Sequence, residues 1–148
     1  MHAVIADDDE DTRSLVREAL SSFTVHEAAT GIELLEQVAH ARELDLIVTD
    51  IDMGWFDGIH AVACLRGAGV AVPIIVITAS SEPGPLARVA QLPDAMLLRK
   101  PFSPAELRAH AERLTRQRDD DARARGLVRL DRAGATDGST DLLDDRKP

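Results

Sequence analysis

Five side chains that could bind a phosphoryl group and a metal ion lie at the ends of short apolar runs. Asp7 and Asp8 follow the first run, and Asp50 ends a later one. Thr78 and Lys100 come directly after two further runs. Carboxylates bind Mg²⁺, a hydroxyl can donate a hydrogen bond to a phosphoryl oxygen, and an ammonium group can balance its charge. Together these residues could hold a divalent cation and a phosphoryl group.

These side chains can meet if the apolar runs form one parallel sheet. Short apolar runs alternate along the chain with segments of helical period, which is typical of repeated β-α units. The carboxyl ends of parallel strands lie along one edge, where ligands bind in open α/β sheets. We therefore expect an α/β fold with five helices and five parallel strands, near residues 2–6, 24–28, 45–50, 73–78 and 95–99.

The spacing of apolar residues locates the first two helices. The first is expected to begin between Asp9 and Asp11 and to bury a face made of Leu15, Val16, Ala19, Leu20 and Phe23. The second begins with Thr30 and Glu33, a capping-box pattern in which both side chains accept hydrogen bonds from free backbone amides. Its expected buried face consists of Ile32, Leu35, Val38 and Ala39.

Glycine and proline set the limits of the other three helices. The third is expected over residues 58–66, before a glycine-rich segment. The fourth is expected to be short, residues 86–92, because prolines precede it and proline removes a backbone donor. Ser103, Pro104 and Glu106 give a strong start for the fifth helix. Its inner face would contain Leu107, Ala111 and Leu114.

The composition limits the class of protein and its compartment. The 148 residues include 17 basic and 26 acidic side chains, and the formal charge of −9 repels a nucleic acid backbone, so we expect no direct nucleic acid binding. Cys64 is the only cysteine, so we expect no intrachain disulfide, a packed thiol and a reducing cytoplasm. The N-terminus reaches Asp7 too early for a signal sequence or a membrane span.

The chain is expected to contain one domain and a tail. Residues 1–118 hold the expected strands and helices. From residue 119 the chain is charged and has few residues that could build a core, so residues 119–148 are expected to be disordered. Two alternatives remain for parts of the tail. The last helix could continue to about Arg125, and residues 127–130 or 142–143 could dock on another surface.

The residue types at the ligand edge fit transfer of a phosphoryl group from nitrogen to a carboxylate. The group carries negative charge throughout, so it needs nearby cations more than a strong base. Asp50 would be the nucleophile, because carboxylates form acyl phosphates. Asp7 and Asp8 would join it in holding Mg²⁺. Thr78 and Lys100 would bind the phosphoryl oxygens.

Motifs at the expected strand ends also carry a family resemblance. They are Asp7-Asp8-Asp9, the strand that ends in Asp50, Asp52-Met53 with Asp57-Gly58, Ile77-Thr78-Ala79, and Lys100-Pro101-Phe102. With these motifs, residues 1–118 resemble the receiver domain of two-component response regulators. The resemblance implies a doubly wound, flavodoxin-like receiver fold and Mg²⁺-dependent phosphotransfer to Asp50 from a histidine kinase or histidine phosphotransfer protein. It also implies a backbone contact from Asp52 to the metal and a cis peptide before Pro101.

The resemblance implies a phosphoacceptor signalling domain, which would assist only its own phosphorylation and dephosphorylation. No output domain follows the expected domain, so we expect a stand-alone regulator that signals by contact with a downstream protein target. The protein would be cytoplasmic and would be a monomer or a weak homodimer.

The chain departs from the family pattern at two positions. Gly54 stands where the family commonly has proline, so the loop after Asp50 should be more mobile. Leu97 stands where the family commonly has Tyr or Phe as a switch residue, so the readout of phosphorylation could be different or weak. Asp52 and Ser80 are hypothesised to alter the rate of dephosphorylation.

Two other functions are possible from the sequence. A pseudo-receiver would keep the fold only as a docking scaffold, which the departures at Gly54 and Leu97 would allow. A small phosphatase similar to haloacid dehalogenases would use Asp50 and Asp52 as its paired aspartates. In that family, however, the acids that bind the metal should follow the lysine. In this chain the acidic pair, Asp7 and Asp8, comes long before Lys100.

Trp55 and Phe56 are two large aromatic residues in the loop directly after the expected acceptor. They could form a partner surface, since exposed apolar groups often mark one. Packing on the core under the loop is an equal alternative.

Overall fold

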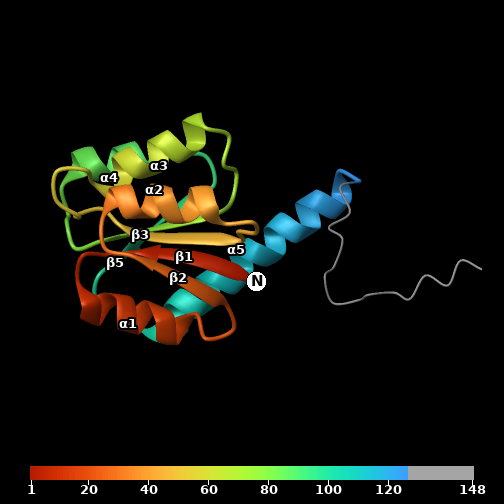
Figure 1. The fold of residues 1–148 in the computed structure, drawn as a ribbon, viewed down its shortest axis with the longest axis horizontal. Helices are drawn as coiled ribbons and strands as arrows, with labels where there is room; N and C mark the ends of the chain where they lie inside the picture. Colours follow the sequence, from red (N-terminus) through yellow and green to blue (C-terminus); the bar gives the residue numbers. More distant parts are fainter. Residues whose placement is uncertain (127–148) are drawn as a thin grey trace, which may run out of the picture.

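A five-stranded sheet forms the centre of the molecule in a computed structural model, which describes residues 1–126 (Figure 1). The strands are β1 (His2–Ala6), β2 (Thr24–Ala28), β3 (Leu46–Asp50), β4 (Ile74–Thr78) and β5 (Ala95–Arg99). They lie in the order β2-β1-β3-β4-β5, and each neighbouring pair is parallel. All carboxyl ends therefore lie along one edge.

Within residues 1–126, five helices alternate with the strands. They are α1 (Glu10–Ala19), α2 (Gly31–His40), α3 (Gly58–Gly67), α4 (Pro83–Ala90) and α5 (Pro104–Ala124). Figure 1 shows α2, α3 and α4 on one face of the sheet and α1 and α5 on the other. The predicted doubly wound, five-stranded parallel fold with a short fourth helix is confirmed.

Side-chain caps fix where α2 and α5 begin. The hydroxyl of Thr30 accepts a hydrogen bond from the Glu33 amide at 3.1 Å, and the Glu33 carboxylate accepts one from the Ala29 amide at 2.8 Å. The hydroxyl of Ser103 accepts from the Glu106 amide at 3.1 Å, and Pro104 follows at the first helical position. These bonds satisfy amides that lack partners within the helix.

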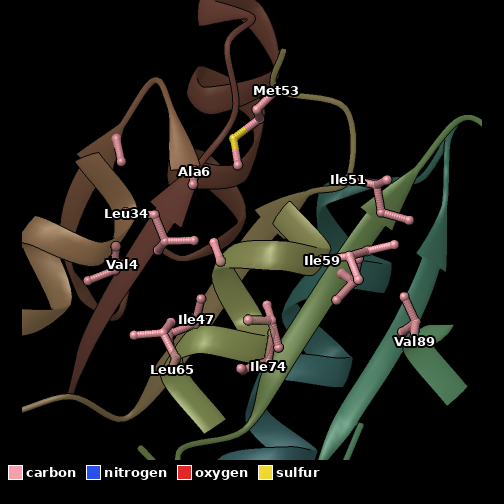
Figure 2. Close-up of a cluster of buried hydrophobic side chains, with 14 of the residues drawn as sticks. Val4, Ala6, Leu34, Ile47, Ile51, Met53, Ile59, Leu65, Ile74 and Val89 are labelled. Atoms are coloured by element: carbon pink, nitrogen blue, oxygen red, sulfur yellow. The ribbon is translucent and has the colours of Figure 1, made fainter. Parts of the chain in front are cut away.

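The core consists of two layers separated by the sheet. Val4 faces the layer under α2, α3 and α4, whereas its neighbour Ile5 faces the layer under α1 and α5, as the twofold period of a strand requires. The residues of β3 and β4 are all buried. Figure 2 shows the first layer, which includes Val4, Leu34, Ile47, Ile59 and Ile74. This packing holds the strand ends in place.

Two sequence-based assignments of buried residues are wrong. In α2, Ile32 is 44% exposed and Ala39 is exposed, whereas Leu34 is fully buried. The inner stripe starts at Gly31, whose missing side chain hides the pattern from a search for apolar residues. Cys64 is exposed, because the inner face of α3 is formed by other residues, namely Ile59, Ala61, Val62 and Leu65.

The limits of α4 and α5 also differ from expectation. α4 begins at Pro83, earlier than the predicted residues 86–92, because first-turn amides have no partner within the helix and proline there removes no bond. α5 continues to Ala124, as the longer alternative proposed. Residues 119–124 of the expected tail are thus helical. The possible docking segments at 127–130 and 142–143 lie outside the described residues.

In the described part of the chain, no helix is both long enough and apolar enough to cross a membrane.

Candidate functional site

The sheet brings the predicted site residues to one edge. β3 ends in Asp50, which pairs in register with Ile77, one residue before the end of β4. Thr78 pairs with Arg99, and Lys100 follows directly. The Lys100 amide then donates to the Thr78 carbonyl at 2.8 Å. The parallel register therefore places the ends of β3, β4 and β5 side by side.

Three carboxylates form a compact acidic pocket at this edge. Ligand oxygens of Asp7, Asp8 and Asp50 all lie within 4.8 Å of one another. Asp7 and Asp50 are only 3% and 5% exposed, whereas Asp8 is exposed. Like charges held this close and removed from water repel each other strongly. The pocket therefore requires compensating positive charge.

Lys100 supplies part of that charge. Its Nζ lies 2.9 Å from Asp50 Oδ2 and 3.4 Å from Asp7 Oδ2. Burial lowers the pKa of Lys100, but its hydrogen bonds to the two carboxylates and their charges outweigh burial and raise it above the ordinary value. The ammonium group thus stays charged within the pocket. The peptide between Lys100 and Pro101 is cis, as the family resemblance implies.

One cation does not balance the pocket completely. Burial raises the pKa of Asp7 from its ordinary value of 3.8 to about 6, and the nearby charge of Asp50 adds to the rise. The Asp9 amide, which donates to Asp7 Oδ1 at 2.9 Å, and the charge of Lys100 oppose it. Ionising Asp7 therefore costs free energy, and a bound divalent cation would remove that cost. The donor set and its electrostatics therefore fit Mg²⁺, with Asp7, Asp8 and Asp50 as the carboxylates that would hold it.

Thr78 is fully buried beside the pocket. Its hydroxyl oxygen accepts a hydrogen bond from the Ser80 amide at 2.9 Å, and the Ser80 hydroxyl accepts one from the Glu82 amide at 3.1 Å. Accepting a bond does not use the hydroxyl proton, so Thr78 can still donate to a phosphoryl oxygen. The two bonds also connect Thr78 to the residue that precedes α4.

The backbone after Asp50 turns tightly around its carboxylate. The Asp52 amide donates to Asp50 Oδ1 at 3.2 Å, and the Gly58 amide donates to the Ile51 carbonyl at 3.0 Å. A Cβ atom at Gly58 would lie 1.9 Å from the carbonyl oxygen of Asp50. Only glycine fits here. Gly58 belongs to a family-like motif of the sequence but was not among the predicted site residues, because its sequence position, eight residues after Asp50, does not reveal this contact.

The two departures from the family pattern have clear structural positions. Gly54 adopts φ +81°, a left-handed conformation that favours glycine. Leu97 lies in β5, partly buried against the core layer under α2, α3 and α4. Trp55 is 86% exposed, and Phe56 packs on that same layer. Of the two alternatives for these aromatics, exposure therefore holds for Trp55 and core packing for Phe56.

Known proteins share this sequence pattern. Residues 3–112 match the response regulator receiver domain. The chain is 37% identical over 127 residues to the response regulator MprA of Mycobacterium leprae, which covers 82% of this chain and 54% of that protein. It is 36% identical over 118 residues to MprA of Mycobacterium tuberculosis, a match that covers 77% of this chain and 50% of that protein. The chain thus spans about half the length of the curated relatives it matches.

Solved structures share the fold. The receiver domain of the Francisella response regulator 1452 is 25% identical with a TM-score of 0.70, over 79% of this chain and 98% of that one. The chemotaxis protein CheY4 of Vibrio cholerae is 28% identical with a TM-score of 0.69, over 77% and 98%. The sequence match over most of the chain, the sheet topology and the acidic pocket lead to one conclusion: the chain belongs to the response regulator receiver domain family.

Proposed function

We propose that this receiver domain accepts a phosphoryl group on Asp50 from a histidine kinase or a histidine phosphotransfer protein. The observation that carries the proposal is the placement of Lys100, whose Nζ lies 2.9 Å from Asp50 Oδ2 inside the pocket formed with Asp7 and Asp8. A carboxylate held beside a fixed cation can receive an anionic group without a strong base.

Each side chain has a role in this transfer. A carboxylate oxygen of Asp50 forms the new O–P bond as the N–P bond of the donor histidine breaks. Lys100 and the hydroxyl of Thr78 bind phosphoryl oxygens, on which the negative charge lies. Mg²⁺, held by Asp7, Asp8, Asp50 and the Asp52 carbonyl group, would supply further positive charge. Asp52, whose amide donates to Asp50, and Ser80, whose amide donates to Thr78, are proposed to alter the lifetime of the acyl phosphate.

The domain is proposed to act through protein contacts in the cytoplasm, as a monomer or weak homodimer and without enzymatic turnover of other substrates. The net charge of −9 opposes direct contact with nucleic acid by the chain. Leu97 and Gly54 are proposed to modify how phosphorylation changes the surface that a downstream target binds. Residues 1–118 are proposed as the functional unit.

A mass measurement tests the acceptor. The protein is incubated with acetyl phosphate and MgCl₂, and a single phosphoryl adduct that hydroxylamine removes is expected. Asp50→Asn should abolish the adduct. Asp11→Asn is the matched control, because Asp11 is an exposed carboxylate of α1 outside the pocket, and it should leave the adduct unchanged.

The same assay separates the alternatives, neither of which the family match favours. Multiple turnover of phosphomonoesters would support the phosphatase. Absence of an adduct from acetyl phosphate and from histidine kinases alike would support a pseudo-receiver and contradict the proposal. An adduct that persists in Asp50→Asn would show that Asp50 is not the acceptor.

A further inference from the structure

The loop between β3 and α3, residues 51–57, must hold the backbone of Asp52 beside the acceptor. Both ends of this loop are fixed. The Ile51 amide donates to the Ile77 carbonyl at 3.0 Å, and the Gly58 amide returns to the Ile51 carbonyl at 3.0 Å. The middle contains Gly54, at which an added Cβ would have no neighbour within 4 Å. A glycine in open space restrains the loop little, so the restraint has to come from another residue.

Phe56 makes contacts that can provide this restraint. A Cβ atom at Gly31, the first residue of α2, would lie 2.4 Å from the Phe56 carbonyl oxygen and 2.5 Å from its ring atom Cδ1. Both the backbone and the ring of Phe56 therefore lie directly against Gly31. The Phe56 ring also stacks on the His60 imidazole of α3, with the ring centroids 6.3 Å apart.

Neighbouring residues strengthen the anchoring at Phe56. The Asp57 carboxylate accepts hydrogen bonds from the His60 amide at 2.9 Å and lies 2.8 Å from His60 Nδ1, which fixes the ring on which Phe56 stacks. Met53 is 5% exposed and belongs to the same core layer (Figure 2). The Trp55 ring lies 5.9 Å from the Phe56 ring, but Trp55 is 86% exposed and is not part of the core layer.

We propose that Phe56, seated on Gly31, is a positioning residue that fixes the loop and so presents the Asp52 carbonyl group to Mg²⁺. This inference rests on the proposed function. Groups that orient a metal ligand without touching the metal typically change its affinity by about 10- to 100-fold. Glycine at position 31 is needed for this contact, because the side chain of any other residue would displace the Phe56 backbone.

Two variants disturb the contact from opposite sides. Phe56→Ala removes the ring, and Gly31→Ala pushes the loop away. Titration with MgCl₂, followed by the fluorescence of Trp55, the only tryptophan, should show roughly tenfold weaker binding in both. Saturating MgCl₂ should restore the yield of phosphorylated protein. Phe56→Leu, which refills part of the space, should recover part of the affinity and carries the test if Phe56→Ala does not fold.

A second readout needs no metal. Amide hydrogen exchange of residues 52–57 in the metal-free protein should be faster in Phe56→Ala than in the wild type, because the loop loses its restraint. Ile32→Ala is the matched control. Ile32 follows Gly31 in α2 but is 44% exposed, so its replacement should change neither measurement.

The outcomes separate this inference from the proposed function. Wild-type Mg²⁺ affinity and loop exchange in folded Phe56→Ala and Gly31→Ala proteins would overturn the positioning role while leaving the acceptor intact. An equal loss in Ile32→Ala would also overturn it. Failure of the wild-type protein to bind Mg²⁺ would contradict the proposed function. If amide exchange of residues 52–57 were also unchanged in Phe56→Ala, the proposed restraint of the loop by Phe56 would be wrong as well.

Discussion

The charges of Asp7, Asp50 and Lys100 do not balance on their own. Two buried carboxylates share one ammonium group, at 3.4 Å and 2.9 Å. Lys100 lowers the cost of ionising Asp7, yet the pKa of Asp7 remains raised to about 6 because the group is buried. The residues that would bind the cation therefore cost stability while the cation is absent, as ligand sites often do.

This imbalance predicts a pH dependence for the metal-free protein. The folded-state pKa of Asp7, about 6, lies above its unfolded value of 3.8, so the folded state binds the proton more tightly. The stability contribution of this group is present below about pH 4 and is lost as pH rises through 6. Asp7→Asn removes the loss and should be more stable at pH 7 by something on the order of 2 kcal/mol. Urea unfolding of both proteins in EDTA, at pH 5 and at pH 7, measures this difference in stability.

Adding MgCl₂ should reverse this pH dependence of stability. The metal binds the ionised carboxylates, so it should stabilise the wild type at pH 7 and do so much less at pH 5, where Asp7 is protonated. Asp11→Asn, which alters an exposed acid, should behave like the wild type. An Asp7→Asn protein that is no more stable than the wild type at pH 7 without metal would count against this account.

At the scale of elements, the first residue of α3 packs directly against the last residue of β3. Gly58 brings the helix against the carbonyl group of Asp50, whereas Gly67, in the last turn of the same helix, has no atom near an added Cβ. Gly58→Ala should therefore destabilise the fold by about 1–3 kcal/mol through overpacking. Gly67→Ala should be neutral or stabilising, by up to about 1 kcal/mol, because alanine favours helix. Chemical denaturation of both variants provides the comparison.

The loop before α3 has a conformation that excludes the residue common in the family. Gly54 adopts φ +81°, and proline is fixed near −65°. Gly54→Pro should therefore weaken Mg²⁺ binding and lower stability, even though it restores the family pattern. Gly54→Ala should cost only about 1–2 kcal/mol, the penalty of a left-handed alanine. Titration with MgCl₂ and urea unfolding test the pair, and a Gly54→Pro protein that binds more tightly would show that the loop can adopt another conformation.

At the scale of the whole molecule, α5 extends beyond the core. Its buried residues Leu107, Ala111 and Thr115 lie in the half of the helix nearer Pro104, and the helix continues to Ala124 (Figure 1). Among the described residues, 1–126, both buried core clusters are formed by residues up to Ala111. Because residues 127–148 are charged and contain few apolar side chains, we expect a chain that ends at Gly126 to unfold within about 2 °C of the full chain. Calorimetry of the two chains tests this, and a larger drop would assign residues 127–148 a stabilising role.

Much of this architecture was predictable from local patterns. The runs that form β3 and β4 are mostly apolar because these strands are covered on both faces, and such runs mark central parallel strands. Ser103 and Thr30 marked helix starts because their caps involve residues only three positions away. The order of the acidic, hydroxyl and lysine motifs identified one ligand edge, because parallel strands place their carboxyl ends together.

Other features depended on contacts between residues distant in the sequence, and only the tertiary structure decided them. Packing around α2 selected Leu34 over Ile32 as a core residue. The 2.9 Å contact of Lys100 with Asp50 joins residues fifty positions apart. Phe56 seated on Gly31, and Gly58 against Asp50, are fits of one element to another, which periodicity and capping do not encode. The sequence alone thus determined the elements and the chemistry at their ends, and packing decided how tightly that chemistry is held.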